Sequence, residues 1–207
     1  MGKFNVVTIS RTFGSGGKGI GKQLADEMGY AFYDKEVVRL ACERSGLPEE
    51  FFNEDRTGRS SLLYSLAMGL GGAGALPSQY QHALSDDRVF SLQSDIIREK
   101  AAEGRAVFVG RCAGYVLRHE ANVLNVYLNA DMDYRVAQIA ARYQISEDAA
   151  RKKIQKTDKS RKTYYTYYTN HTWGDTADYH MCLNISKLGQ QGAARMIRDF
   201  LELANES

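Results

Sequence analysis

A glycine-rich stretch near the N-terminus constrains the fold of this chain more than any other feature. Residues 9–22 read ISRTFGSGGKGIGK; an apolar, β-branched run (4–9) precedes them, and a helical apolar pattern (17–28) overlaps their end. Glycines let the backbone bend so that successive N–H groups point at one anion, and the helix N-terminus adds partial positive charge. The order strand, glycine loop, helix therefore predicts a phosphate-binding loop.

The loop matches the phosphate-loop pattern G-x-x-x-x-G-K-[ST] only in part. Gly17 and Lys18 fit, and Lys18 is expected among the β- and γ-phosphates as a point charge. Thr12 replaces the first glycine, and Gly19-Ile20 stands where a hydroxyl would hold magnesium. The alternative is a flexible glycine loop after an edge strand. The position between an apolar strand and a helix favours the phosphate site.

Composition limits the class of protein. A chain of 207 residues with 43% hydrophobic content is expected to form one domain with an ample core. With 27 basic and 25 acidic residues the net charge is +2, which does not indicate a nucleic-acid binder. Cys42, Cys112 and Cys182 have neither disulfide nor metal-ligand spacing. Since no signal sequence or apolar run of about 20 residues is present, we expect a cytoplasmic protein without a membrane segment.

Apolar segments alternate with helical patterns along the whole chain. Strands are expected at 4–9, 30–33, 106–109, 122–128 and 179–185, and helices at 17–28, 35–44, 87–103, 112–118, 134–143, from 146 onward and 189–204. Such alternation predicts an α/β fold, a five-stranded parallel sheet with helices on both faces and right-handed crossovers. We treat residues 1–207 as a single domain.

Two segments depart from this alternation. Residues 45–87 include a Gly-rich stretch (69–77) and predict either a helical insert that closes over a site or an ordinary surface excursion. Arg56 and Arg59 within it either reach a substrate phosphate or remain surface arginines. Residues 144–172 predict either a lid that neutralises phosphate charge or a solvated helix face. The basic residues of this segment are Arg151, Lys152, Lys153, Lys156, Lys159, Arg161 and Lys162.

Three further features lie where expected strands and helices end. Asp34 follows the second strand and either caps the next helix or contacts substrate. Arg111 follows the third strand, where open α/β sheets bind ligands, and its planar fork suits phosphate oxygens. The alternative for Arg111 is a surface ion pair. The aromatic run 163–173 either stacks a base or forms a packing or dimer surface, and we favour the latter, which makes a homodimer possible.

The chain resembles the cytidylate kinase-like proteins, relatives of bacterial cytidylate kinase among the nucleoside monophosphate kinases. The matching segments are ISRTFGSGGKGIGKQLA (9–25), FYDKEVV (32–38), VFVGRCAGYVL (107–117), DKSR (158–161) and WGDTADYHMCLNISKLG (173–189). The resemblance implies a three-layer P-loop kinase fold in which a helical acceptor insert (45–87) and a lid (144–172) flank the site.

The resemblance also implies residue roles. Arg111 matches the arginine that contacts the acceptor phosphate, Asp158 and Arg161 match residues that hold the acceptor and the transferring phosphoryl group, and Asp34 begins the acceptor-binding segment. The ATP-binding loop corresponds to Gly14, Ser15, Gly16, Gly17, Lys18 and Gly19. Because Ile20 replaces a threonine, magnesium must be held by waters and ATP oxygens or by another side chain such as Ser10.

The sequence therefore predicts an ATP-dependent phosphotransferase that uses Mg²⁺ and nucleotide substrates, with CMP or dCMP as the favoured acceptor. Phosphoryl transfer needs in-line positioning and charge neutralisation, for which Lys18, Arg111 and Arg161 are the candidate catalytic residues. Two alternatives stay open: a small-molecule kinase with a non-nucleotide acceptor, and a nucleotide-binding sensor that has lost catalysis.

Overall fold

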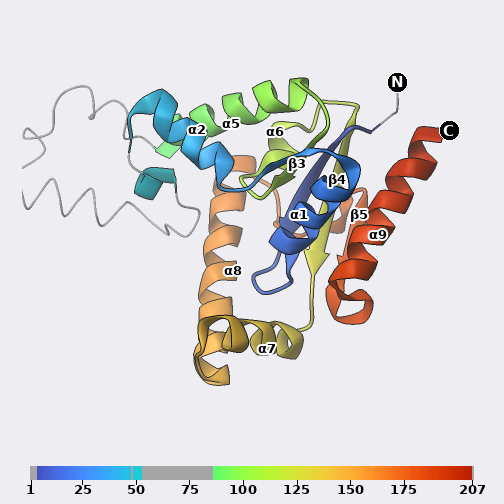
Figure 1. The fold of residues 1–207 in the computed structure, drawn as a ribbon. Helices are drawn as coiled ribbons and strands as arrows, with labels where there is room; N and C mark the ends of the chain where they lie inside the picture. The colour runs from blue at the N-terminus through green and yellow to red at the C-terminus, as the bar shows by residue number, and fades with distance from the viewer. Residues whose placement is uncertain (1–3, 48, 53–85, 207) are drawn as a thin grey trace, which may run out of the picture.

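The computed structural model describes residues 4–47, 49–52 and 86–206 (Figure 1). In this part of the chain one five-stranded sheet has the order β2-β3-β1-β4-β5, and all neighbouring strands are parallel. The strands are β1 (Val6–Arg11), β2 (Ala31–Tyr33), β3 (Ala106–Val109), β4 (Val123–Asn129) and β5 (Met181–Asn184). The predicted α/β fold with a five-stranded parallel sheet is confirmed.

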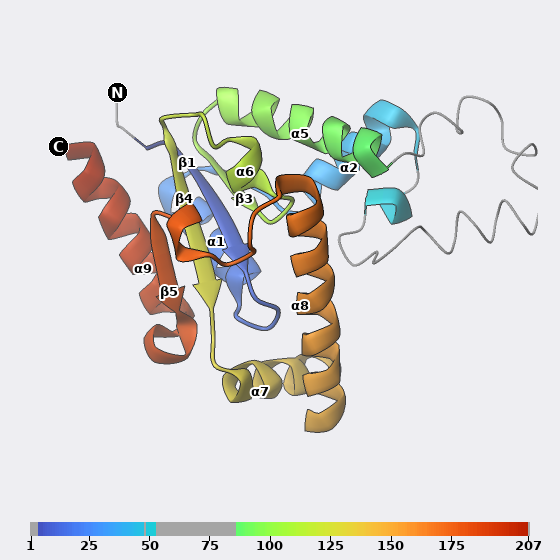
Figure 2. The same cartoon turned by 180° about the vertical axis from the view of Figure 1, so that it is seen from behind.

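Helices cover both faces of the sheet. On one face lie α1 (Gly17–Met28) and α9 (Ile185–Glu206), and on the other lie α2 (Glu36–Ser45), α5 (Asp86–Ala102) and α6 (Ala113–Val116). Figure 1 shows α1 in front of the sheet. In Figure 2, which views the molecule from the opposite side, α6 lies in front of the sheet. A short 3₁₀ turn, η1 (Glu49–Phe52), follows α2. Most of the expected insert, including Arg56 and Arg59, lies outside the described residues.

Alternate residues of the central strand build the two cores. Val7 and Ile9 of β1 pack with α1 and α9, whereas Val6 packs with α2, α5 and α6. Successive side chains of a strand point to opposite faces, so a strand covered on both sides reads as a continuous apolar run. This is why the N-terminal apolar stretch becomes the middle of the sheet.

The first strand ends later than the sequence predicts. Ser10 and Arg11 extend β1 because they pair in register with Tyr127 and Leu128 of β4. Polar residues are tolerated there because this end of the sheet opens onto a cavity. The last helix begins earlier than expected, at Ile185, and turns sharply at Gly189 (φ 69°, ψ 169°).

Helix α1 approaches the sheet closely at Gly21. A Cβ atom added there would lie 2.9 Å from Cγ2 of Val109 and 3.2 Å from Cδ1 of Ile9. We expect Gly21→Ala to lower the free energy of unfolding by about 1–3 kcal/mol, because the close-packed helix must shift. Chemical denaturation measures this change. The matched control is Gly192→Ala in α9, where the added Cβ meets Leu188 at an ordinary 3.6 Å; it should raise stability by about 0.5–1 kcal/mol. Equal effects of the two substitutions would contradict the close approach.

Helices α7 (Met132–Tyr143) and α8 (Glu147–Thr169) form a hairpin that projects from one end of the molecule (Figures 1 and 2). It has a small core of its own, made by Val136, Ile139, Ala150 and Ile154, against which Phe13 packs. Ser146 caps α8, because its hydroxyl accepts from the N–H of Ala149 at 3.3 Å. The movement expected of this α7–α8 hairpin as a lid stays a prediction.

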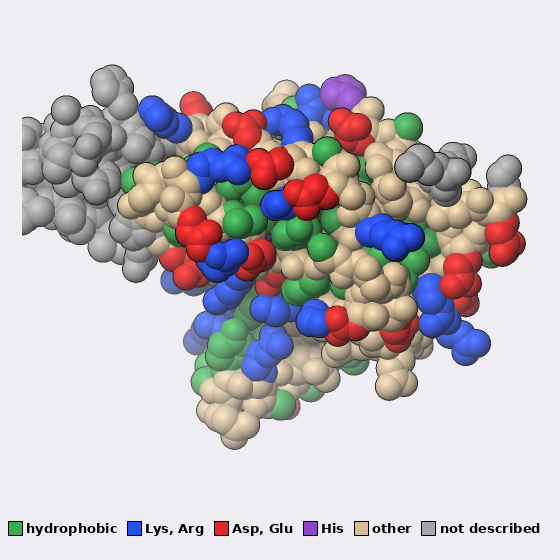
Figure 3. Space-filling model, turned by 45° about the horizontal axis from the view of Figure 1, so that its top comes forward, with side chains coloured by type: hydrophobic (Ala, Val, Ile, Leu, Met, Phe, Trp, Pro, Cys, Tyr) green, Lys and Arg blue, Asp and Glu red, His purple; other side chains and the backbone are tan. Residues whose placement is uncertain are grey.

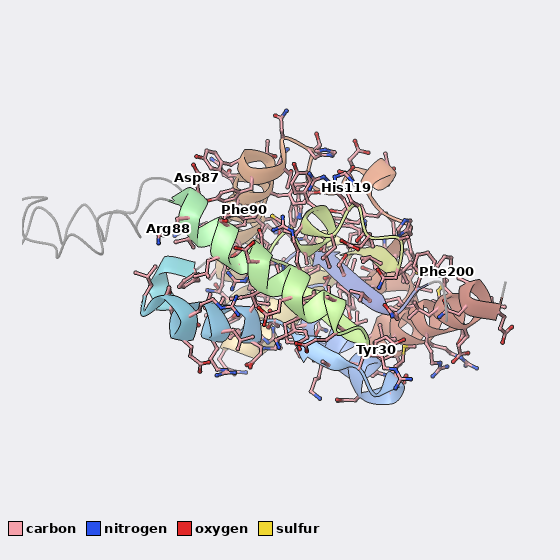
Figure 4. The ribbon with its side chains drawn as sticks, turned by 90° about the horizontal axis from the view of Figure 1, so that it is seen from above. Tyr30, Asp87, Arg88, Phe90, His119 and Phe200 are labelled. Atoms are coloured by element: carbon pink, nitrogen blue, oxygen red, sulfur yellow. The ribbon has the colours of Figure 1, made fainter. Side chains whose placement is uncertain are left out.

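The far end of α8 packs on the body of the protein through aromatic rings. Phe90 of α5, labelled in Figure 4, stacks on Tyr168 with ring centroids 4.1 Å apart, and Tyr164 meets Tyr168 edge-on. Tyr165 is buried, while Tyr167 is exposed. Much of the aromatic run is therefore an intramolecular packing surface, and the homodimer stays a prediction. No helix among the described residues has the length and apolarity needed to cross a membrane.

Candidate active site

A polar cavity of about 340 Å³ lies at the carboxyl ends of β1, β2 and β3. It brings together Lys18, Asp34, Arg111 and Arg161, which belong to four separate segments of the chain. The full lining is Arg11, Thr12, Phe13, Gly14, Gly16, Gly17, Lys18, Gly19, Asp34, Lys35, Arg111, Gln138, Ile139, Arg142, Arg161 and Gln190. Most of the residues predicted to bind ATP or the acceptor thus share one cavity.

The glycine loop has the backbone shape that an anion site needs. Gly14 (φ 87°) and Gly16 (φ 85°) both adopt left-handed conformations, which glycine enters without a steric penalty. Gly16 precedes α1, and no side chain caps that helix. The N-terminus of α1 therefore lies at the cavity, and its first N–H groups have no side-chain cap. An incoming phosphate could accept hydrogen bonds from them.

Ser15 does not line the cavity. Its side chain is fully buried, and its hydroxyl donates to the carbonyl oxygen of Thr12 at 2.9 Å. Its own N–H also points at Thr12, at 3.4 Å. Ser15 therefore closes the loop from inside, and Thr12, which stands where the phosphate-loop pattern has glycine, takes part in that closure.

Lys18 and Asp34 form an ion pair across the mouth of the cavity. The Nζ–Oδ2 distance is 2.9 Å, and the side chains are 56% and 14% exposed, respectively. Helix α2 has Lys35 at its N-cap position and no side-chain cap, so the capping alternative for Asp34 is wrong. The ammonium group that is expected to meet phosphate is thus already balanced by a carboxylate, and an incoming anion must compete with it.

Arg111 lies in a strained turn directly after β3. Gly110, Arg111 and Cys112 have φ values of 79°, 58° and 53°. A non-glycine residue held in this region costs about 1–3 kcal/mol, and such residues cluster at functional sites. The turn ends the strand abruptly and places Arg111 on the cavity lining, where its Nη1 donates to the carbonyl oxygen of Phe52 in η1.

Arg161 is the residue of the basic run on α8 that lines the cavity. Its Nη1 donates to the carbonyl oxygen of Arg11 at 3.2 Å, and its guanidinium lies 5.4 Å from the centre of the Phe13 ring. The remaining basic residues of the run, Arg151, Lys152, Lys153, Lys156, Lys159 and Lys162, are exposed. Figure 3 shows blue side chains gathered where the α7–α8 hairpin projects. These six residues match the solvated helix face, whereas the lid that neutralises phosphate charge stays a prediction for Arg161.

Asp158 is not part of the cavity lining. Its Oδ1 accepts from the N–H of Phe13 at 2.8 Å, and its Oδ2 accepts from Nη1 of Arg135 at 2.5 Å. The acceptor-binding role that the resemblance implies for Asp158 stays a prediction, and both of its oxygens are engaged elsewhere.

Several lining residues were missed at the level of sequence. Arg11 and Lys35 flank predicted site residues, but a single basic residue forms no pattern that would predict a site. Arg142 of α7 and Gln190 of α9 come from helices far along the chain. The side chain of Gln190 lies over the loop, because a Cβ added at Gly16 would be 2.8 Å from its Cδ. No local signal could have indicated that contact.

The residues on the cavity fit a magnesium ion held mainly by substrate. Magnesium in kinases is bound by one or two carboxylates together with phosphate oxygens and waters, and Asp34 supplies a carboxylate on the lining. In the described part of the chain no three His, Cys, Asp or Glu side chains cluster as a metal site. Ser10 lines a different cavity, and its hydroxyl accepts from Nε1 of Trp173 at 3.2 Å. The geometry thus favours Asp34 over Ser10 as the magnesium contact.

The second cavity, of about 80 Å³, lies beside Gly110 and Cys112 on the α6 face of the sheet. Burial raises the pKa of the Tyr165 and Tyr179 hydroxyls, and burial together with Tyr179 raises the pKa of nearby Tyr127 to about 12. His171 faces Asp178 there, with Nδ1 3.0 Å from the carboxylate. These phenols stay protonated at neutral pH, so they present hydroxyl groups to the cavity, which Arg118 and Asp178 also line.

Solved structures share this fold. An uncharacterised protein from Eubacterium ventriosum is 25% identical, with a TM-score of 0.69 over 95% of this chain and 98% of that one. Shikimate kinase from Bacteroides thetaiotaomicron is 15% identical, with a TM-score of 0.53 over 95% and 98% of the two chains. Shikimate kinase from Acinetobacter baumannii, in complex with shikimate, is 11% identical, with a TM-score of 0.51 over 96% and 93%. At such identities the two kinases show the fold alone.

Comparison with curated protein sequences found no match. The sequence model of the cytidylate kinase-like family, however, matches residues 6–187. This range contains all five strands, the glycine loop and every site residue predicted from the sequence, whereas Gln190 of the cavity lining lies beyond it. The chain therefore belongs to the cytidylate kinase-like family.

Proposed function

We propose that this protein transfers the γ-phosphoryl group of ATP to a nucleoside monophosphate, with CMP or dCMP as the favoured acceptor. One observation carries the proposal: the uncapped glycine loop, Lys18, Arg111 and Arg161 line a single cavity at the carboxyl ends of the strands. Open α/β sheets bind ligands at that end. Family membership and the kinase fold support phosphoryl transfer as the class of reaction.

The loop and Lys18 are assigned to ATP. The N–H groups at the start of α1 receive the phosphate oxygens, and Lys18 exchanges its contact with Asp34 for one with the β- and γ-phosphates. Phosphoryl transfer depends almost entirely on positioning and electrostatic stabilisation, so groups that neutralise charge without covalent chemistry are sufficient. The pair with Asp34 keeps Lys18 near its working position before ATP arrives.

Asp34 is assigned to magnesium once Lys18 has left it. When bound, Mg²⁺ neutralises charge on the β- and γ-phosphate oxygens. The carboxylate of Asp34 would hold the ion directly or through water, in place of the hydroxyl that Gly19-Ile20 lacks. This assignment keeps Asp34 at the start of the acceptor side, where the family resemblance puts it.

Arg111 and Arg161 are assigned to the acceptor and to the group in transit. Arg111 comes from the turn after β3 and Arg161 from α8, so the two guanidinium groups approach the cavity from different elements. Planar guanidinium groups bind phosphate oxygens in pairs, which orients the acceptor as well as neutralising it. The choice of CMP or dCMP rests on family membership, because the cavity itself is a phosphate site.

A screen for ATP consumption tests the proposal. The purified protein is incubated with ATP and, in turn, CMP, dCMP, UMP, AMP and GMP, with and without Mg²⁺, and the products are separated. We expect magnesium-dependent formation of ADP and CDP or dCDP. Binding of ATP without turnover of any acceptor would support the sensor instead, and turnover with a non-nucleotide alcohol alone would support a small-molecule kinase.

A further inference from the structure

The α7–α8 hairpin holds the phosphate loop at Phe13. The ring of Phe13 packs against the small core between the two helices. The hairpin is therefore attached to the nucleotide loop by the same residue that precedes Gly14. The loop assigned to ATP is thus joined to an element that projects from the body of the protein.

Both backbone polar groups of Phe13 are bound by one ion pair that bridges the two helices. Its N–H donates to Oδ1 of Asp158 on α8 at 2.8 Å, and its carbonyl oxygen accepts from Nη1 of Arg135 on α7 at 3.3 Å. The same Nη1 donates to Oδ2 of Asp158 at 2.5 Å. Asp158 and Arg135 therefore need each other and Phe13 to complete their contacts.

This ion pair is shielded from water. Arg135 is 8% exposed, and the side chain of Asp158 is 19% exposed. Charged side chains are rarely this buried, and a buried ion pair is weak evidence for added stability because desolvation opposes the attraction. Removing one partner, however, leaves an uncompensated charge. A pair that contributes little net stability but fixes one geometry is suited to positioning.

The ion pair also connects the two sides of the cavity. Gly14 lies directly on α7, because a Cβ added to it would be 3.1 Å from Cβ of Arg135 and 3.1 Å from Cγ1 of Ile139. Arg161 follows Asp158 on α8 by three residues, so the two side chains share one helix face. Any displacement of the hairpin therefore moves the loop amides and Arg161 together.

We propose that Arg135 and Asp158 are positioning residues, which form a latch between the α7–α8 hairpin and the phosphate loop. The latch makes loop shape and hairpin position one linked equilibrium, so that a polyphosphate bound by the loop also sets Arg161. This extends the proposed function, because the polyphosphate is that of ATP. It assigns Asp158 to the loop backbone rather than to the acceptor.

The test uses Asp158→Asn in the full-length protein. The amide can keep the bond to the N–H of Phe13 or face Arg135 with its oxygen, but it cannot do both, and it leaves Arg135 without its counter-charge. We expect hydrogen exchange at the amide of Phe13 to quicken by roughly tenfold or more in the free protein. Calorimetry should show ATP affinity lowered by roughly tenfold, within the range usual for coupled sites.

The chain offers a matched control. Asp133 and Arg151 also join α7 to α8, at 3.0 Å, but Asp133 is 93% exposed and the pair does not touch the loop. Asp133→Asn should leave loop exchange and ATP affinity unchanged. Arg135→Lys keeps the positive charge and should retain more ATP affinity than Arg135→Met. A purely structural role would lower the melting temperature without changing ATP affinity well below it.

Two results would overturn the latch. One is an Asp158→Asn protein whose Phe13 amide exchanges at the wild-type rate. The other is a loosened loop with unchanged ATP affinity. The exchange measurement needs no substrate, so it judges the latch even if the wild type proves inactive in the nucleotide screen. An active wild type with an unaltered Asp158→Asn variant would reject the latch and leave the proposed function standing.

Discussion

Lys18→Ala is expected to reduce kcat by roughly 10³-fold or more while the fold stays intact. Loss of a cation that stabilises the transferring phosphoryl group has effects of this order in phosphoryl-transfer enzymes. The side chain is 56% exposed and its described ion pair is with Asp34, so truncation opens no cavity in the core. Steady-state kinetics with ATP and the acceptor found in the screen measure the loss, and circular dichroism and a melting curve check the fold.

The control for Lys18 lies one turn further along the same helix. Lys22 is similarly exposed and pairs with Asp26, away from the cavity lining. Lys22→Ala should therefore keep wild-type kinetics. Lys18→Arg should recover only part of the activity, because a planar fork does not replace a compact point charge. Full activity in Lys18→Ala would refute both the role of the lysine and the assignment of the loop.

Arg111→Ala is expected to lower kcat/KM for the acceptor by roughly 10²- to 10³-fold, while ATP affinity changes little. Removing a guanidinium from a phosphate contact loses charge-assisted, bidentate hydrogen bonds and leaves the anion unpaired, which costs about 2–5 kcal/mol. The loss should fall mainly on the acceptor, because Arg111 follows β3 whereas the loop that receives ATP follows β1. Varying each substrate in turn separates the two effects.

Arg118 provides the comparison for Arg111. It follows α6, is exposed, and lies 4.0 Å above the ring of Tyr115, outside the phosphate cavity. Arg118→Ala should leave both KM values unchanged. Arg111→Lys should remain impaired, since one ammonium cannot reproduce two parallel donors. If Arg111→Ala instead weakened ATP binding and left the acceptor KM unaltered, Arg111 would belong to the ATP site, and its assignment to the acceptor phosphate would be wrong.

Local patterns were sufficient for the elements that carry the loop. The helix expected at 17–28 and the strand expected at 106–109 match α1 and β3 residue for residue. Both have unambiguous ends, because glycines bracket α1 and Gly104 and Gly110 bracket β3. Because Arg111 follows the end of this buried strand, the sequence also predicted its place at the cavity. Periodicity and glycine thus located the centre of the site.

Contacts between distant segments could not be read from local pattern. Asp34 precedes a helix, as a cap would, yet it pairs with Lys18 because β2 ends beside the start of α1. Asp158 lies among basic residues that suggest a phosphate site, yet it binds the backbone of Phe13, 145 residues earlier. Strand β1 ran past its apolar residues because β4 offered partners to Ser10 and Arg11. In each case a contact with a distant segment of the chain decided between structures that the local sequence allows equally.

The strand order determines when the sheet can form during biosynthesis. β1 is made first, yet its neighbours in the sheet, β3 and β4, begin only at Ala106 and Val123. Until those segments have left the ribosome, the strand that leads into the glycine loop has neither of its hydrogen-bonded neighbours. Long-range parallel pairing of this kind is slow and leaves apolar strands exposed meanwhile. A nascent chain that ends before β4 would therefore contain the whole nucleotide loop but could not hold it in its folded conformation.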